Sequence, residues 1–166
     1  MIEARRRKTT PAAPLKGVRI LIVESGYYED IADTLLDGAR RALEAAGAKY
    51  DVVTVPGALE IPQAVVIALG AARGARAYEG VVALGCVIRG ETSHYDIVAG
   101  ESARALMDIG VTRGVPVGNG ILTVDTAAQA HRRAALDAGD KGGVAASAAL
   151  ALVRLKRDRA APRKRR

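Results

Sequence analysis

One segment, residues 81–96, combines a histidine, neighbouring hydroxyl groups and two glycines in an order that suits acid-base chemistry on an anion. Its first four residues, Val81 to Leu84, are apolar and predict a buried strand. Gly85 and Gly90 then allow the backbone to turn and to approach a ligand closely. The segment therefore predicts a strand, a tight loop and a helix.

The helix start in this segment is the candidate anion site. Thr92 or Ser93 can cap the helix, whose first backbone amides and positive dipole end favour a phosphate group. His94 lies one or two residues inside the helix and can exchange protons near neutral pH. Such turns are common in α/β proteins, so on these residues alone a helix cap followed by a solvated histidine is an equal alternative.

Strands and helices are expected to alternate along the chain. Apolar and alternating runs predict four strands, at residues 18–23, 49–55, 81–84 and 116–124. Helical spacing of apolar residues predicts helices from Ile31 to a stop at Gly47, at 63–72, at 93–109, from Asp125 or Thr126 to Ala138, and at 143–157. This order predicts an α/β fold, a three-layer α/β/α sandwich with a four-stranded parallel sheet, and a site at the carboxyl ends of the strands. In the fourth strand, Gly118 and Gly120 indicate that another element approaches the backbone.

The positive charge of the chain is concentrated at its two ends. The length of 166 residues suits one domain with its own core. The net charge is +7, and residues 1–16 carry five Lys/Arg and one acid, while residues 154–166 carry eight and one. We expect residues 1–16 and 158–166 to be disordered basic arms around a domain at 17–157. Because no aromatic residues accompany these charges, the arms would bind nucleic acid only nonspecifically.

Cysteine usage and hydropathy favour a cytoplasmic protein. The single cysteine, Cys86, excludes an intrachain disulfide framework and fits a reducing compartment. No run is long and apolar enough to predict a membrane span, and the basic residues at 5–8 are not followed by the apolar stretch of a secretion signal.

The loops at the carboxyl ends of the four strands are expected to meet in one pocket. They carry Tyr27 and Tyr28, the carboxylate of Glu60, the loop that ends at His94, and the residues from Asn119 onward. The sequence has neither a Cys/His cluster for a transition metal nor a G-x-G-x-x-G motif after the first strand. We therefore expect acid-base catalysis on a small phosphorylated compound, without a metal or a cofactor.

Three separated segments resemble the signatures of the lumazine synthase family of riboflavin biosynthesis. Residues 55–62 match Val-Pro-Gly-Ala-Phe/Leu-Glu-Ile-Pro, and residues 84–96 match Leu-Gly-x-Val-Ile-Arg-Gly-x-Thr-x-His-Tyr/Phe-Asp/Glu. The third match runs over residues 116–123 and continues at Gln129, Ala130 and Arg133. Order and spacing agree over residues 17–153. The resemblance implies a flavodoxin-like fold and the condensation of 5-amino-6-(D-ribitylamino)uracil with 3,4-dihydroxy-2-butanone 4-phosphate to 6,7-dimethyl-8-ribityllumazine.

The resemblance also implies a role for each matching residue. It places the acid-base group at His94 and the ring that stacks on the pyrimidine at Tyr27, with Tyr28 as the alternative if the register shifts by one. Further substrate contacts fall on Ala58, Leu59, Glu60, Cys86, Val87, Ile88 and Asn119, and phosphate contacts on Glu91, Thr92, Arg133 and Lys141. Asn119 and Lys141 match positions that reach the pocket from a neighbouring subunit. A homo-oligomer built from pentamers is therefore implied, with riboflavin synthase as a candidate partner.

Two departures from the family pattern leave an alternative open. Asp137 stands where many relatives have Lys, and Asn119 where Phe is frequent. These changes favour a non-catalytic homologue that binds lumazine or flavin, or that forms a shell, whereas retention of His94, Arg133 and Glu60 favours the enzyme. A flavodoxin-like carrier is disfavoured because its phosphate loop should follow the first strand. The sequence does not choose among a pentamer, a decamer and a 60-subunit shell.

Overall fold

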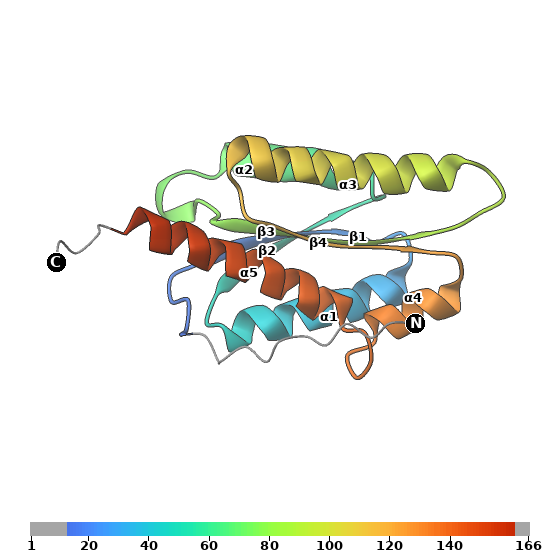
Figure 1. Cartoon of the computed structure of the whole chain (residues 1–166), viewed down its shortest axis with the longest axis horizontal. Coiled ribbons are helices and arrows are strands. Elements are labelled where there is room, and N and C mark those ends of the chain that lie inside the picture. The colour runs from blue at the N-terminus through green and yellow to red at the C-terminus, as the bar shows by residue number, and fades with distance from the viewer. Residues whose placement is uncertain (1–12, 162–166) are drawn as a thin grey trace.

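Residues 13–161, which the computed structural model describes, form one parallel sheet between two layers of helices (Figure 1). The strands are β1 (Arg19–Ser25), β2 (Lys49–Val55), β3 (Gly80–Ile88) and β4 (Val117–Val124), in the order β2-β1-β3-β4. Helices α2 (Glu60–Ala71) and α3 (His94–Arg113) cover one face, and α1 (Glu29–Ala45), α4 (Ala127–Ala134) and α5 (Lys141–Ala160) cover the other. A short 3-10 helix, η1 (Gly74–Arg76), precedes β3. The predicted three-layer α/β/α sandwich with a four-stranded parallel sheet is confirmed.

The core consists of two apolar clusters, one on each face of the sheet. Side chains of a strand alternate between its faces, so Ile20 and Ile22 of β1 pack toward α1 and α5, while Leu21 and Val23 pack toward α2 and α3. All but the last residue of β3 are buried, as expected for a central strand covered on both faces. β2 and β4 are the edge strands, and β4 ends beside the functional loops described below.

Close packing between α5 and β4 confirms the expectation raised by the glycines of the fourth strand. A Cβ atom on Gly118 would lie 2.8 Å from the carbonyl carbon of Ala145 in α5. A Cβ atom on Gly120 would lie 2.9 Å from the methyl group of the same alanine. Real Cβ atoms do not approach carbon this closely, so α5 lies against this strand only because both positions lack a side chain.

The prediction of a turn at Gly85 is wrong. β3 continues through Gly85 and Cys86 to Ile88, and pairs in register with β4 up to Val124. Gly85 serves close packing instead, because a Cβ atom there would meet the Ile61 side chain of α2 at 3.3 Å. The loop after β3 is therefore shorter than the sequence suggested.

Several helix boundaries also differ from the prediction. α3 passes through Gly110 and ends before Gly114, whose φ of 60° is the left-handed conformation typical of a helix stop. α2 begins at Glu60, three residues early, with Pro62 in its first turn. Thr126 caps α4 as expected, but α4 ends at Ala134 rather than Ala138.

The turn between α4 and α5 explains the early end of α4. A Cβ atom at Gly139 would lie 2.7 Å from the Cα atom of Arg133, so this glycine lets the chain fold back on α4. Asp140 has a φ of 38° and its side chain accepts a hydrogen bond from the Gly143 amide at 3.0 Å, which caps α5. As a result α5 begins at Lys141, two residues before the predicted start.

The described ends of the chain join the domain. Leu15 is buried, and its amide donates a hydrogen bond to the Ala46 carbonyl at 2.8 Å. α5 extends to Ala160. Ordered packing thus includes residues on both sides of the predicted 17–157 boundaries, whereas the rest of the predicted arms, 1–12 and 162–166, lies outside the described residues. Within residues 13–161 no helix combines the length and apolarity needed to cross a membrane.

Candidate active site

A cavity of about 450 Å³ opens where the carboxyl ends of β1, β2 and β3 meet the first turn of α3. The loop after β1 contributes tyrosines, the segment between β2 and α2 contributes a carboxylate, and the end of β3 with the start of α3 contributes the histidine. The lining consists of Tyr27, Tyr28, Gly57, Ala58, Leu59, Glu60, Cys86, Val87, Ile88, Gly90, Thr92, His94, Tyr95 and Val98. Most of the predicted site residues are therefore brought together by one chain.

An aromatic pair forms one side of the cavity. The Tyr27 and Tyr28 rings meet edge to face, with centroids 5.0 Å apart and an interplanar angle of 72°. The Tyr27 side chain is 70% exposed, which leaves a ring face free for a planar ligand. Burial, followed by the neighbouring Tyr27 and Cys86 groups, raises the pKa of Tyr28. Tyr28 therefore keeps its phenolic proton in neutral solution and can donate a hydrogen bond.

The carboxylate of Glu60 lies at the mouth of the cavity in the first turn of α2. A helix N-terminus favours a negative charge at this position. A Cβ atom on Gly57 would lie 2.8 Å from Glu60 Oε2, so the glycine leaves the space that this carboxylate occupies. The arrangement presents an acceptor suited to hydroxyl groups.

Two hydrogen bonds at the end of the sheet hold the loops after β1 and β2 together. Thr54 of β2 donates a hydrogen bond from Oγ1 to Oε1 of its register partner Glu24, at 2.8 Å. The amide of Gly26 donates to the Val55 carbonyl at 3.3 Å. Glu24 is 8% exposed, and its Oε2 has no hydrogen-bond partner within the described part of the chain. This carboxylate fixes the position of the loop that carries the tyrosines relative to the loop that carries Glu60.

The floor of the cavity is apolar and includes a thiol. Cys86 and Val87 of β3 are 7% and 9% exposed. Burial, followed by the negative charge of Asp30, raises the pKa of the Cys86 thiol to about 11. The thiol is therefore protonated at neutral pH and acts as a small apolar residue rather than as a nucleophile.

His94 is the first residue of α3 and faces this cavity from its rim. Its amide donates a hydrogen bond to Thr92 Oγ1 at 3.3 Å, whereas Ser93 at the N-cap position makes no side-chain cap. From the position before the N-cap, the Thr92 hydroxyl thus accepts a hydrogen bond from the first free amide of this helix. His94 and Thr92 are both exposed and accessible to a ligand, and the amides of the first helical turn lie beside them.

Four predicted site residues lie outside the cavity of their own chain. Glu91 is exposed in the loop before α3, Arg133 is half-buried in the last turn of α4, and Lys141 begins α5. Asn119 pairs with Ala83 near the start of β4, about 16 Å from the end of that strand at ~3.3 Å per residue. The prediction that Asn119 joins the carboxyl-edge loops of its own chain is therefore wrong.

Two lining residues were not selected from the sequence. Tyr95 comes from the first turn of α3, and Val98 from the start of the second. Val98 lies four residues after His94 and so on the same helix face, and this spacing is the signal that could have identified it. Among residues 13–161 no group of three or more His, Cys, Asp or Glu side chains is placed to hold a metal ion.

Comparisons with known proteins agree with this geometry. The family model described as 6,7-dimethyl-8-ribityllumazine synthase matches residues 17–157, which include every strand and all but the end of α5. The chain belongs to the lumazine synthase family. The resemblance stated from three short motifs thus extends across the whole sheet.

Several lumazine synthases are similar over nearly their full length. The Azorhizobium caulinodans 6,7-dimethyl-8-ribityllumazine synthase is 61% identical over 95% of this chain and 98% of its own. The Methylobacterium sp. protein of the same name is 62% identical over 98% of this chain and 91% of its own. Rhizobium meliloti 6,7-dimethyl-8-ribityllumazine synthase 1 is 61% identical over 87% and 95%.

Proposed function

We propose that this chain condenses 5-amino-6-(D-ribitylamino)uracil with 3,4-dihydroxy-2-butanone 4-phosphate, releasing phosphate and water and forming 6,7-dimethyl-8-ribityllumazine in the cytoplasm. The observation that carries the proposal is the meeting of three loops in one cavity, with a tyrosine pair, a carboxylate, and a histidine at a helix N-terminus. Family membership and the names of the relatives support the same reaction.

Each side of the cavity suits one part of the reaction. The open Tyr27 ring offers a stacking surface for the pyrimidine, and Glu60 offers an acceptor for the ribityl hydroxyls. Thr92 and the first amides of α3 offer a place for the phosphate. Imine formation, loss of phosphate and ring closure all require proton transfer, and His94 at the rim is the group in the cavity best suited to this task near neutral pH.

We further propose that the site is completed by a second copy of the chain. An apolar groove of about 600 Å³ follows the β4 edge between α3 and α5, and Asn119 is one of its lining residues. Met107, Val111 and Leu155 in this groove are 66%, 75% and 52% exposed. A surface of this kind on an edge strand favours burial against a partner. If a second copy of the chain covered this groove, Asn119 would approach the cavity of that copy, as the matching family positions imply. Arg133 and Lys141 would then be the phosphate-binding cations.

The reaction is tested with the purified protein and both substrates, following lumazine absorbance and released phosphate. We expect turnover by the wild type and a fall of roughly 10²–10⁴-fold in kcat for His94→Ala, the usual contribution of a general acid-base group. His131→Ala is the matched control, since this second histidine lies on α4 outside the cavity. Binding of the lumazine without turnover by the wild type would support the alternative, a non-catalytic binding homologue.

A mixing experiment tests whether sites form between subunits. Arg133→Ala and His94→Ala are each expected to have low activity. If the two residues of one site come from different chains, random co-assembly of equal amounts regenerates about a quarter of the sites with both residues intact. Recovery of activity near that level supports the shared site, whereas no recovery in verified mixed assemblies places both residues in the same subunit.

A further inference from the structure

Arg89 follows β3 directly and reaches across the loop that leads to His94. Its guanidinium carbon lies 4.1 Å from the centre of the Tyr95 ring, and its Nη1 lies 3.5 Å from Asp96 Oδ1. Tyr95 and Asp96 are the two residues that follow His94 at the start of α3. One side chain therefore connects the first residue of this loop to the helix turn that contains the histidine.

The guanidinium is also anchored to the turn after β4. Arg89 Nε donates a hydrogen bond to Asp125 Oδ1 at 3.1 Å, and the Arg89 amide donates to the Val124 carbonyl at 2.9 Å. Asp125 is itself held, because its amide donates to Gln129 Oε1 at 2.9 Å. The contacts thus connect the helix start to the end of the sheet, where β3 and β4 are paired in register up to Ile88 and Val124.

The residues between these anchor points have few other contacts. All four residues at 90–93 are exposed, and a Cβ atom placed on Gly90 would meet nothing within 4 Å. Their one side-chain hydrogen bond among residues 13–161 joins Thr92 to the His94 amide. An exposed loop held this loosely would sample several conformations without a further restraint.

We propose that Arg89 is a positioning residue for the reaction. By stacking on Tyr95 and pairing with Asp96 and Asp125, it sets the direction in which His94 enters the cavity and the place of the phosphate-binding helix start. This inference rests on the proposed function. It adds a side chain that lies outside the cavity lining and touches it through Tyr95.

The expected effect is selective for one half of the site. Tyr27 and Glu60, which face the pyrimidine and the ribityl chain, come from other loops and are held by the contacts between β1 and β2. Loss of the Arg89 contacts should therefore lower kcat and raise the KM for the butanone phosphate. The KM for the pyrimidine should change less than about twofold, because the residues proposed to bind that substrate keep their contacts.

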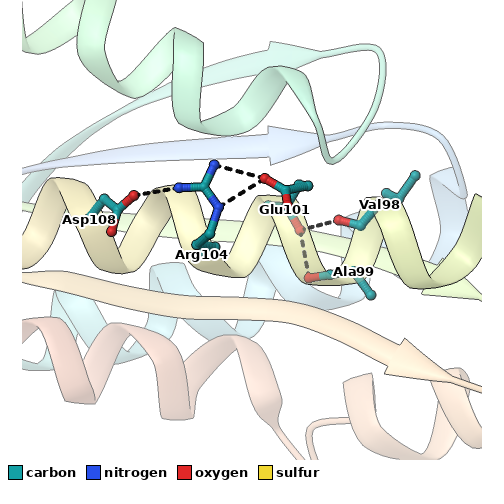
Figure 2. Close-up of polar contacts among 6 residues, drawn as sticks. Val98, Ala99, Glu101, Arg104 and Asp108 are labelled. Atoms are coloured by element: carbon teal, nitrogen blue, oxygen red, sulfur yellow. Dashed lines mark hydrogen bonds and ion pairs between the residues drawn. The ribbon is translucent and has the colours of Figure 1, made fainter.

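Arg104 provides a matched control. It also bridges two carboxylates, donating to Glu101 Oε2 at 2.8–2.9 Å and to Asp108 Oδ2 at 2.6 Å (Figure 2). Arg104 is exposed on α3 and is not one of the residues that line the cavity. Its side chain is 61% exposed, compared with 46% for Arg89. Arg104→Gln therefore removes the same charge and the same type of contact without touching the helix start.

The experiment compares wild type, Arg89→Gln, Arg89→Lys, Asp125→Asn and Arg104→Gln in the full assembled protein. For Arg89→Gln we expect a decrease in kcat of about tenfold or more, as for other small displacements of a catalytic group. Arg89→Lys and Asp125→Asn should fall between it and the wild type, since each keeps part of the network. Arg104→Gln should match the wild type.

Hydrogen-deuterium exchange supplies an independent readout. Amides of residues 89–96 should exchange faster in Arg89→Gln than in Arg104→Gln, while the loops at 26–28 and 56–60 should be unchanged. Wild-type turnover with Arg89→Gln kinetics equal to those of Arg104→Gln would overturn the positioning role and leave the proposed function intact. An equal rise in KM for both substrates would also overturn it, because it would indicate general distortion. Absence of turnover by the wild type would instead refute the proposed function.

Discussion

Replacing Gly118 with alanine tests whether the close contact between α5 and β4 determines the stability of the domain. The added Cβ atom would lie 2.8 Å from the Ala145 carbonyl carbon, about 0.6 Å closer than ordinary van der Waals contact. The obstructing atoms belong to the backbone of α5, so no side-chain rotation can relieve the overlap. The helix or the strand has to move.

The size of the effect follows from the two opposing contributions. Overpacking of a well-filled core destabilises proteins by about 1–3 kcal/mol, and a backbone obstruction belongs at the upper end of that range. Replacement of a strand glycine recovers roughly 0.5–1 kcal/mol of chain entropy. We therefore expect Gly118→Ala to lower the free energy of unfolding by about 2 kcal/mol and the melting temperature by about 4–8 °C.

The assay is urea unfolding followed by circular dichroism at one fixed protein concentration, because association changes apparent stability. Gly100→Ala in α3 is the control, since a Cβ atom there meets nothing within 4 Å of the described chain. That substitution should raise the free energy of unfolding by up to about 1 kcal/mol. If Gly118→Ala stays within about 0.5 kcal/mol of wild type, the packing argument is refuted.

The remaining predictions concern a thiol, an ion pair and the groove. Because burial raises the pKa of Cys86 to about 11, iodoacetamide should label this thiol slowly at pH 7. The labelling rate, measured by mass spectrometry, should rise about tenfold for each pH unit up to that pKa. Rapid labelling at pH 7 would contradict the burial of Cys86. Hydrogen bonds from Tyr78 and Arg19 outweigh partial burial and lower the pKa of Asp51 below 3.8, so Asp51→Asn should reduce stability by less than about 1 kcal/mol at pH 7. That difference should disappear as the pH falls below 3.8 in denaturation experiments, since the contribution of a carboxyl with a depressed pKa is lost when it protonates. Val111→Lys should dissociate the assembly in size-exclusion chromatography and reduce turnover with it, while an intact, active assembly would exclude the groove as the subunit contact.

The sequence predicted the structure correctly where a residue type restricts the backbone by itself. β2 was predicted at its observed bounds, residues 49–55, because an alternating run between Gly47 and Pro56 leaves little freedom at either end. The glycines of β4 likewise indicated a close neighbour, and α5 is that neighbour. In both cases the residue type constrains the backbone directly.

Predictions from the sequence failed where tertiary packing decided the outcome. Gly85 was interpreted as a turn, but pairing with β4 and the space required by Ile61 keep it in β3. Gly110 did not end α3, since a helix supported by tertiary contacts tolerates a glycine whose local cost is about 1 kcal/mol. Sequence alone cannot weigh these contacts, because the partners are distant in the chain.

The candidate site shows the same division. Predicted site residues such as Tyr27, Glu60 and His94 gather in one cavity because each follows a strand of a parallel sheet. Asn119 was predicted at the carboxyl edge of the sheet, because the motif shows which residues flank it in sequence but not how far along β4 it lies. A position inside a strand belongs to the carboxyl edge only if it lies near the strand's end.

The two halves of the cavity are held by different forces, and this determines how mutations should act on them. The loops with Tyr27 and Glu60 are held by a partly buried hydrogen bond, in which the exposed Thr54 hydroxyl donates to the buried carboxylate of Glu24. The helix start with His94 is held by the exposed ion pairs of Arg89, which solvent screens. Loss of the Thr54 hydroxyl would leave the buried Glu24 carboxylate without this hydrogen bond and should lower the stability of the whole fold. Loss of the exposed contacts releases only a short loop, so its consequences should appear in catalysis before they appear in stability.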